Sequence, residues 1–385
     1  MEFDDLLLDD VDRLIEADTR DLLLMTASAG ASMRAAALLV EPATLERQIQ
    51  EGRPRTVLVV GGGGSRAAGD ILAAIAGNRS PVPVVTVSGP ALPGWVGPTD
   101  LVFAVSGSGA TSETLSVAGE AARRGCRLVS VCPSKSPLAE LTSATRGGEA
   151  VRVGIPPIAG KWRARTLMWS LATPLLLIGG ALGLVEDAED SLDRAAARLD
   201  EIADECSPTR ELVANHSKRM AVELATSLPL LWGTGPVGAV AARRFGRQLA
   251  ENAGLPTVVG TLPEAARTQA ALMSGPLAGQ VDEDDIFRDR IAEPDPSARL
   301  RLILLRDSDE HPSTAALADA AVGLANSRKV PVEVLRAQGL YPLERLADLV
   351  GRTDFAAIYA GLALGIDPMS SKNELDARRD GSQEL

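Results

Sequence analysis

The stretch TVLVVGGGGSRAAGDILAAIAG, residues 56–77, decides the fold class of this chain. It begins with a short run of apolar, β-branched residues, Thr56–Val60, which is typical of a strand buried in a parallel sheet. A glycine-rich turn follows, and Arg66–Gly77 then has the composition of a helix. The backbone N–H groups of such a turn point at a ligand, and the positive end of the helix dipole favours an anion. The turn residues that we expect to face a ligand are Gly63, Gly64 and Ser65. A plain tight turn is the alternative interpretation.

The same alternation of strands and helices continues along the chain. Further strands are expected at 81–88, 100–106, 127–132 and 150–156, with a helix at 111–125. After a charged amphipathic helix at 186–206, the pattern restarts with strands at 228–233, 255–260, 299–306 and 330–337 and a helix at 239–254. Such alternation predicts doubly wound parallel sheets, and its recurrence predicts two similar α/β domains. The acidic segment 281–298, which contains two prolines, is expected to be a surface insertion.

Composition and charge narrow the class of protein. A chain of 385 residues is long enough for two or three domains of about 150 residues each. Its 45% apolar and 23% charged residues are typical of a globular protein, and its net charge of −12 argues against a general nucleic-acid binder. Three cysteines without CxxC spacing favour a reduced, cytoplasmic protein. Two histidines leave little room for a histidine-based metal site.

One apolar run, residues 166–185, is about long enough to span a bilayer. It carries Ser170, Thr173, Pro174 and a pair of glycines in its middle. We therefore expect a helix buried in a core or in a dimer interface, and no membrane partner.

The motif SGSGATSET, residues 106–114, carries the strongest functional signal. It follows the third expected strand and opens the next helix, at the carboxyl end of a parallel sheet, where α/β proteins bind their ligands. Its hydroxyl groups and the helix-terminal N–H groups suit a phosphate without the help of a lysine. The residues that we expect to bind the phosphate are Ser106, Ser108 and Thr111. The alternative is a capping box, in which Thr111 and Thr114 only cap the helix.

Other phosphate-binding motifs fit less well. The chain lacks GxxxxGK[ST], which excludes an NTPase P-loop. GTGPVG at 233–238 and GGGSRA at 62–67 match the dinucleotide pattern, but that pattern also needs an acidic residue at the end of the next strand. Those strands end in Val87-Ser88 and Val259-Gly260, so NAD is a weak alternative.

These motifs resemble those of the sugar isomerase (SIS) domain proteins, and most closely the bifunctional phosphoglucose/phosphomannose isomerases, whose chains hold two such domains. GGGGSRAAGD at 61–70 is similar to that family's GxGGSxxxGD, and SGSGATSET is similar to its SxSGNTxET. In the second half, AENAG at 250–254 is similar to ENAK, and LPE at 262–264 is similar to the LPE that follows it. Residues 1–24 have the composition of an amphipathic acidic arm. The resemblance covers about residues 25–385 and implies two SIS-type domains, at 25–190 and 191–385, the second of the isomerase C-terminal type.

The resemblance also implies an activity. A cytoplasmic homodimer would interconvert glucose or mannose 6-phosphate and fructose 6-phosphate through a cis-enediol, with no cofactor and no metal. Glu251 of the ENA block would be the base that moves a proton between C1 and C2 of the phosphorylated hexose. A carboxyl group in a partly desolvated cleft can act as base and then as acid; a solvated helix residue is the alternative for Glu251. The family's substrate-binding arginine would be Arg163 or Arg165 in WRAR.

The chain departs from the family pattern at the acid–base residues. Arg267 stands where the family has a ring-opening histidine, and an arginine cannot shuttle a proton at neutral pH. The place of the family's C-terminal lysine falls at about Arg378, with Lys372 nearby but out of register. We expect Arg267 or Arg378 to steady the enediolate. The alternative is a non-catalytic phosphosugar-binding sensor that has lost its acid–base set. His216 and His311 are expected to be structural or surface residues.

Overall fold

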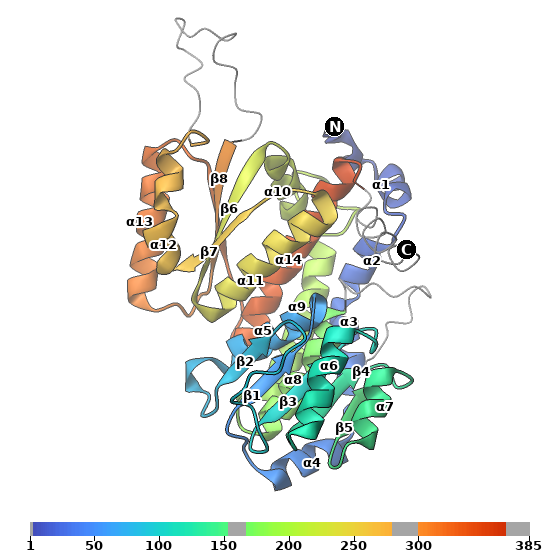
Figure 1. The fold of residues 1–385 in the computed structure, drawn as a ribbon. Helices are drawn as coiled ribbons and strands as arrows, with labels where there is room; N and C mark the ends of the chain where they lie inside the picture. The colour runs from blue at the N-terminus through green and yellow to red at the C-terminus, as the bar shows by residue number, and fades with distance from the viewer. Residues whose placement is uncertain (1–2, 153–166, 279–298, 367–385) are drawn as a thin grey trace, which may run out of the picture. The chain divides into compact units, whose positions relative to one another are not determined.

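The computed structural model describes residues 3–152, 167–278 and 299–366, and it confirms the predicted α/β class with two parallel sheets. The chain divides into two compact units. We call residues 25–201 and 338–348 the first unit, and residues 1–24, 202–337 and 349–385 the second unit. Each unit has a parallel sheet with helices on both faces (Figure 1).

The first unit is built on a five-stranded parallel sheet in the order β2-β1-β3-β4-β5. Its strands are β1 (Val57–Val60), β2 (Val84–Val87), β3 (Leu101–Val105), β4 (Arg127–Cys132) and β5 (Glu149–Arg152). Its helices are α3 (Ala29–Ala37), α4 (Pro42–Glu51), α5 (Gly64–Ala76), α6 (Ser112–Arg123), α7 (Pro137–Ala144), α8 (Met168–Ala181) and most of α9 (Ala188–Glu205), with the short helix η2 (Gly77–Arg79) after α5. The side chains of α6 and α7 form a core with one face of the sheet, and α5 and α8 cover the other face.

The strand order of this sheet reverses direction at β1. After β1 the chain crosses to β2 on one side, and β3 then lies on the other side of β1. Val60 at the end of β1 is in register with Ala104 of β3, so the turns that leave these two strands are neighbours. In open α/β sheets the carboxyl edge at such a reversal is where ligands bind.

Most of the apolar run at 166–185 forms α8, which is buried in a core. A buried core helix was one of the two expected placements of this run. Residues 168–179 of α8 are all buried, and α3, α4 and α5 of the same unit pack against them. Gly179 lets α5 approach closely, because a Cβ atom there would lie 3.0 Å from Leu72. Within the described residues, no helix is both long and apolar enough to cross a membrane. Burial within the first unit accounts for the apolar sequence of this helix, and a dimer contact there stays a prediction.

Residues 338–348 return to the first unit late in the chain. Asp348 accepts hydrogen bonds from Arg198 of α9 at 2.9 and 2.7 Å, and it also accepts one from the backbone N–H of Gln338 at 3.0 Å. Both charged side chains are buried. The ion pair therefore fastens this segment to α9.

The second unit repeats the arrangement with a four-stranded parallel sheet, ordered β7-β6-β8-β9. Its strands are β6 (Ser227–Thr234), β7 (Val258–Leu262), β8 (Arg299–Arg306) and β9 (Val332–Arg336). Its helices are α1 (Val11–Ala17), α10 (His216–Ala225), α11 (Gly235–Gln248), α12 (Glu264–Thr268), α13 (Pro312–Ser327) and most of α14 (Pro342–Ala363), with the short helices η1 (Leu6–Asp9), η3 (Leu249–Ala253) and η4 (Ala270–Ser274). Helix α2 (Leu22–Ala27) lies at the boundary of the units in the sequence.

Several predicted strand ends differ from the structure by one to three residues, as at β2, which is expected at 81–88 and lies at 84–87. The strand expected at 255–260 lies at 258–262, because Pro256 lacks the N–H group that a sheet ladder needs. The strand expected at 150–156 begins at Glu149, and its last four positions lie outside the described residues.

Candidate functional site

The glycine turn after β1 is shaped by close packing. A Cβ atom on Gly61 would lie 2.7 Å from the Cβ of Ser65 and 2.9 Å from the carbonyl oxygen of Val105, at the end of β3. Gly63 has a φ of 60°, a left-handed conformation that favours glycine. Gly64 and Ser65 are buried in the first turn of α5. The N-terminus of a helix of thirteen residues therefore opens directly beside the end of β3.

The hydroxyl groups of Ser106, Ser108 and Thr111 converge in the turn after β3, and we call these three residues the hydroxyl cradle. The Ser106 and Thr111 oxygens lie 3.0 Å apart, and the Ser108 oxygen lies 3.4 Å from each of them. Ser106 is buried, Thr111 is half-buried and Ser108 is exposed, so the cradle runs from the core to the surface. Three hydroxyl groups within hydrogen-bond distance of one another can turn their protons toward one anion.

The cradle also settles the alternative for Thr111. This residue is the N-cap of α6 by position, but its side chain makes no capping hydrogen bond to the helix. Its hydroxyl faces Ser106 and Ser108 instead. The capping-box interpretation is therefore wrong for this turn, and the hydroxyl is available to a ligand at the helix N-terminus.

Gly109 gives the cradle its shape. Its φ is 66°, and a Cβ atom there would lie 2.3 Å from both the Cβ and the Oγ of Ser136. Its N–H group donates to the Ser106 hydroxyl oxygen at 2.9 Å, and its carbonyl oxygen accepts from the Leu138 N–H at 3.0 Å. A side chain at this position would push the turn away from α7.

We expect Gly109→Ala to weaken the binding of a phosphorylated ligand at least tenfold, because the left-handed conformation alone costs an alanine about 1–2 kcal/mol and the clash adds to it. Gly119→Ala is the matched control, because Gly119 lies within α6 and a Cβ there meets only atoms at 3.9 Å. Isothermal titration calorimetry with fructose 6-phosphate measures the effect. Equal affinities in the two variants would contradict the role of Gly109.

Glu251 lies where α11 changes into a single turn of π-helix, η3. Such turns are rare and are frequently found at functional sites. Helix α14 packs tightly against this turn, because a Cβ atom on Gly361 would lie 2.2 Å from the carbonyl oxygen of Asn252. The backbone around Glu251 is therefore held from two sides, by its own helix and by α14.

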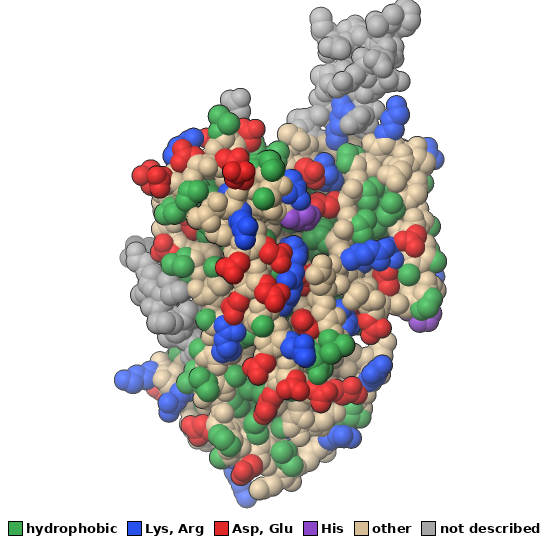
Figure 2. Space-filling view, turned by 180° about the vertical axis from the view of Figure 1, so that it is seen from behind, with side chains coloured by type: hydrophobic (Ala, Val, Ile, Leu, Met, Phe, Trp, Pro, Cys, Tyr) green, Lys and Arg blue, Asp and Glu red, His purple; other side chains and the backbone are tan. Residues whose placement is uncertain are grey.

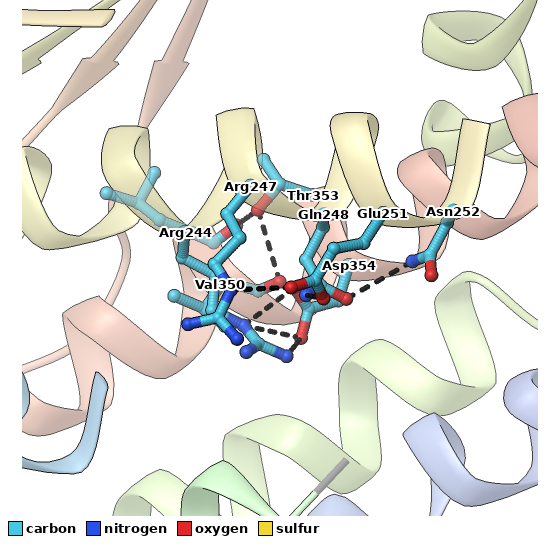
Figure 3. A network of polar contacts seen from close by, with 9 residues as sticks. Arg244, Arg247, Gln248, Glu251, Asn252, Val350, Thr353 and Asp354 are labelled. Atoms are coloured by element: carbon cyan, nitrogen blue, oxygen red, sulfur yellow. Dashed lines mark hydrogen bonds and ion pairs between the residues drawn. The ribbon is translucent and has the colours of Figure 1, made fainter. Parts of the chain in front are cut away.

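Both oxygens of the Glu251 carboxylate have a donor (Figure 3). The Arg247 Nε donates to Oε1 at 2.8 Å, and the Gln248 Nε2 donates to Oε2 at 3.3 Å. The buried Asn252 side chain donates from Nδ2 to the side-chain oxygen Oε1 of Gln248 at 3.2 Å, which orients the Gln248 amide. The Glu251 side chain is 27% exposed, so the carboxylate is oriented and still reachable from solvent.

Behind this carboxylate lies a buried ion pair. The guanidinium of Arg244 donates to both carboxylate oxygens of Asp354, at 2.8 to 3.2 Å. Both side chains are less than a tenth exposed. Burial raises the pKa of Asp354; the positive charge of Arg244 opposes that shift, and the negative charge of Glu251 adds to it. The two carboxylates therefore share one electrostatic environment between α11 and α14 (Figure 3).

The remaining candidate site residues fall into two groups. Arg267 lies on α12, where its side chain is 72% exposed and pairs with the exposed Glu264 at 3.6 Å. Arg163, with its neighbour Arg165, and Arg378 lie outside the described residues. The structure therefore places Arg267 on the surface of the second unit.

The two histidines have structural partners. His216 Nε2 lies 2.9 Å from Glu333, and His311 caps α13 by accepting from the Ser313 N–H at 3.2 Å. Both placements fit the expectation that these residues are structural or lie at the surface.

Residues that the sequence reasoning missed surround Glu251. The spacing of Arg247 and Glu251 is i,i+4 on one helix, and that spacing is a readable signal for an ion pair. Arg244 and Asp354 are 110 positions apart, and no local pattern links them.

Both halves of the chain match known protein families. Residues 53–176 match the SIS domain family, and residues 213–377 match the bacterial phospho-glucose isomerase C-terminal SIS domain. A bifunctional phosphoglucose/phosphomannose isomerase of Caldicellulosiruptor bescii is 25% identical over 316 residues, which cover 82% of this chain and 86% of that protein.

Solved structures are similar in fold. The C-terminal domain of glucosamine-fructose-6-phosphate aminotransferase from Francisella tularensis superimposes with a TM-score of 0.64 at 12% identity, over 91% of this chain and 98% of that one. Tagatose-6-phosphate ketose/aldose isomerase from Escherichia coli gives a TM-score of 0.62 at 14% identity, over 90% and 93%. At such identities these likenesses show the fold alone.

Proposed function

As an SIS-domain protein that resembles the bifunctional phosphoglucose/phosphomannose isomerases, this chain is, we propose, an aldose–ketose isomerase of hexose 6-phosphates. The substrates proposed are glucose 6-phosphate and mannose 6-phosphate, with fructose 6-phosphate as the product. Neither a metal nor an organic cofactor is needed, because proton transfer through an enediol involves no net redox change of the protein.

The convergence of the hydroxyl cradle at the reversal of the first sheet carries the proposal. Ser106, Ser108 and Thr111 supply neutral donors to the phosphate, and the N-termini of α5 and α6 add their dipoles. Gly63, Gly64 and Ser65 would bring backbone N–H groups to the same edge. This arrangement suits the dianion of a sugar phosphate because no charged side chain has to be desolvated to bind it.

Glu251 is proposed as the base. In the open-chain aldose its carboxylate takes the proton from C2, and the electron pair moves to form the C1–C2 double bond of the cis-enediol while the carbonyl oxygen is protonated. The carboxyl group then returns the proton to C1 while the C2 hydroxyl gives up its own proton, so that the C2–O double bond of the ketose forms. Arg247 and Gln248 hold the carboxylate in one orientation, so little reorganisation is needed before the transfer. Arg267 or Arg378 is proposed to steady the negative charge of the enediolate, and Arg163 to contact the substrate.

The alternative function is a phosphosugar-binding sensor without catalysis, and the surface position of Arg267 favours it. A residue that is 72% exposed and paired with a neighbouring glutamate is poorly placed to open a sugar ring. An arginine also stays protonated at neutral pH. An enzyme built in this way would act on the open-chain sugar that forms spontaneously.

A coupled assay with glucose, mannose and fructose 6-phosphates tests the proposal, together with calorimetric binding of the same sugars. We expect Ser108→Ala with Thr111→Ala to weaken binding by about 10²-fold, because each lost charge-assisted hydrogen bond is worth about 1.5 kcal/mol or more. Ser116→Ala is the control, because this exposed α6 serine bonds to the Pro90 carbonyl, outside the cradle.

The outcomes separate the two functions. Turnover by the natural protein supports the isomerase. Binding that depends on the cradle, without turnover of any of the three sugars, supports the sensor. If the double variant binds as tightly as the natural protein, the cradle does not hold the phosphate and both functions lose their support.

The same resemblance supports three further proposals. We propose a homodimer, a cytoplasmic location, and SIS domains at 25–190 and 191–385 that follow the acidic arm at 1–24. Size-exclusion chromatography with light scattering tests the first of these directly.

A further inference from the structure

A hollow in the second unit lies outside the residues that the proposed function uses. Its volume is about 200 Å³, which is room for a small molecule rather than for a single water. It is formed by the end of α9, the loop 207–215, the start of α10 and the middle of α14. The residues that line it are Glu205, Cys206, Arg210, Ala214, His216 and Arg352.

The charged groups of this hollow favour an oxyanion. Arg210 and Arg352 bring two guanidinium groups, and Glu205 brings one carboxylate, which lies 2.8 Å from Arg352. The Nε–H group of Arg210 donates to the backbone carbonyl oxygen of Asp204 at 3.4 Å. This bond uses one of the five N–H donors of the guanidinium. The planar fork of a guanidinium matches the paired oxygens of a phosphate or carboxylate group. In Figure 2, the upper part of the molecule shows Lys and Arg side chains beside a histidine.

The loop 207–215, which forms one wall of the hollow, is held in place by buried side chains. Lys218 is fully buried, and its ammonium group donates to the carbonyl oxygens of Pro208 and Arg210 at 2.8 and 2.7 Å and to that of Leu8. The Asn215 side chain donates to the Ser207 carbonyl at 3.2 Å, while its oxygen caps α10. A surface loop with three of its carbonyls tied to buried side chains is preorganised, which lowers the entropic cost of binding a ligand there.

The imidazole of His216 is also fixed in place. Its Nε2 atom lies 2.9 Å from Oε1 of Glu333 on β9, so the ring has one orientation in the wall of the hollow. The wall thus combines two arginines with an imidazole ring and a loop that are each held by polar contacts to other side chains.

We propose that this hollow is a second oxyanion site, which binds a small molecule through a phosphate or carboxylate group held between Arg210 and Arg352. The site lies in the second unit, whereas the hydroxyl cradle lies in the first. The proposal does not depend on the isomerase function, because it requires no turnover.

Calorimetric titration of the full chain with inorganic phosphate tests the proposal. The Ser108→Ala, Thr111→Ala variant is used as the background, so that binding at the cradle does not obscure a second site. We expect phosphate to bind this background, and Arg210→Gln or Arg352→Gln to weaken that binding at least tenfold. Arg243→Gln is the control, because Arg243 is an exposed arginine of α11, outside both the lining and the loop 207–215. A parallel titration with malonate distinguishes a carboxylate site from a phosphate site.

Two further measurements keep the result interpretable. Arg352→Lys retains a positive charge near Glu205, so a loss of binding shared by Arg352→Gln and Arg210→Gln but not by Arg352→Lys reflects charge and not unfolding. Thermal melting of each variant confirms that it is folded. The proposal is overturned if neither phosphate nor malonate binds the background variant, or if binding is the same in Arg210→Gln, Arg352→Gln and Arg243→Gln.

Discussion

Glu251→Gln is expected to lower the turnover of hexose 6-phosphates by about 10²- to 10⁴-fold, which is the usual contribution of a positioned general base. Glutamine keeps the size of the side chain and its acceptor oxygen, so the contact with Arg247 is largely preserved. It cannot accept the proton from C2. We therefore expect kcat to fall while the affinity for the sugar phosphate, measured by calorimetry, changes little.

The control for this substitution is Glu186→Gln, at a residue whose side chain is 81% exposed in the first unit. It removes the same charge from the protein without touching the network around Glu251. Turnover by Glu251→Gln within a factor of two or three of the natural protein would show that another group moves the proton.

Asp354→Ala is expected to lower the free energy of unfolding by about 3–5 kcal/mol, because it leaves the buried guanidinium of Arg244 without its counter-charge. Urea denaturation followed by circular dichroism measures the loss. Turnover should fall as well, since Arg244 lies on the helix that also carries Arg247 and Gln248. An unpaired charge beside them would draw water or the Glu251 carboxylate toward itself.

A double substitution tests whether the loss of stability comes from the charge of Arg244 left without a partner. Arg244→Met with Asp354→Leu removes both charges and keeps most of the volume, and such replacements of buried pairs are often neutral or stabilising. We expect it to recover most of the stability that Asp354→Ala loses. A loss of less than about 1 kcal/mol in Asp354→Ala would contradict the account, because it would match a solvated ion pair.

The features that could be predicted from the sequence are those formed by contiguous residues. The strand β1, its glycine turn and α5 follow one another directly in the sequence. Each of them can be recognised from its own residues, without knowledge of a distant partner. The hydroxyl cradle lies within six consecutive positions, so its convergence follows from the turn that joins β3 to α6. The burial of α8 in a protein core could be predicted, because its serine, threonine, proline and glycine residues favour protein surroundings over lipid.

The features that could not be predicted depend on distant residues. Arg198 meets Asp348 across 150 positions, and this pair helps to place residues 338–348 with the first unit. The π-helical turn at Glu251 is held by Gly361, whose close approach to Asn252 is a matter of helix packing. Lys218 reads as an ordinary helix lysine in the sequence, yet it is fully buried beneath the loop 207–215. Such pairings are decided by tertiary packing, and no local periodicity reports them.

A crystal of the protein soaked with fructose 6-phosphate tests the central claim most directly. The account predicts density for a phosphate group whose oxygens lie within hydrogen-bond distance of the Ser106, Ser108 and Thr111 hydroxyls. A sugar phosphate bound elsewhere, with the cradle empty, would contradict it.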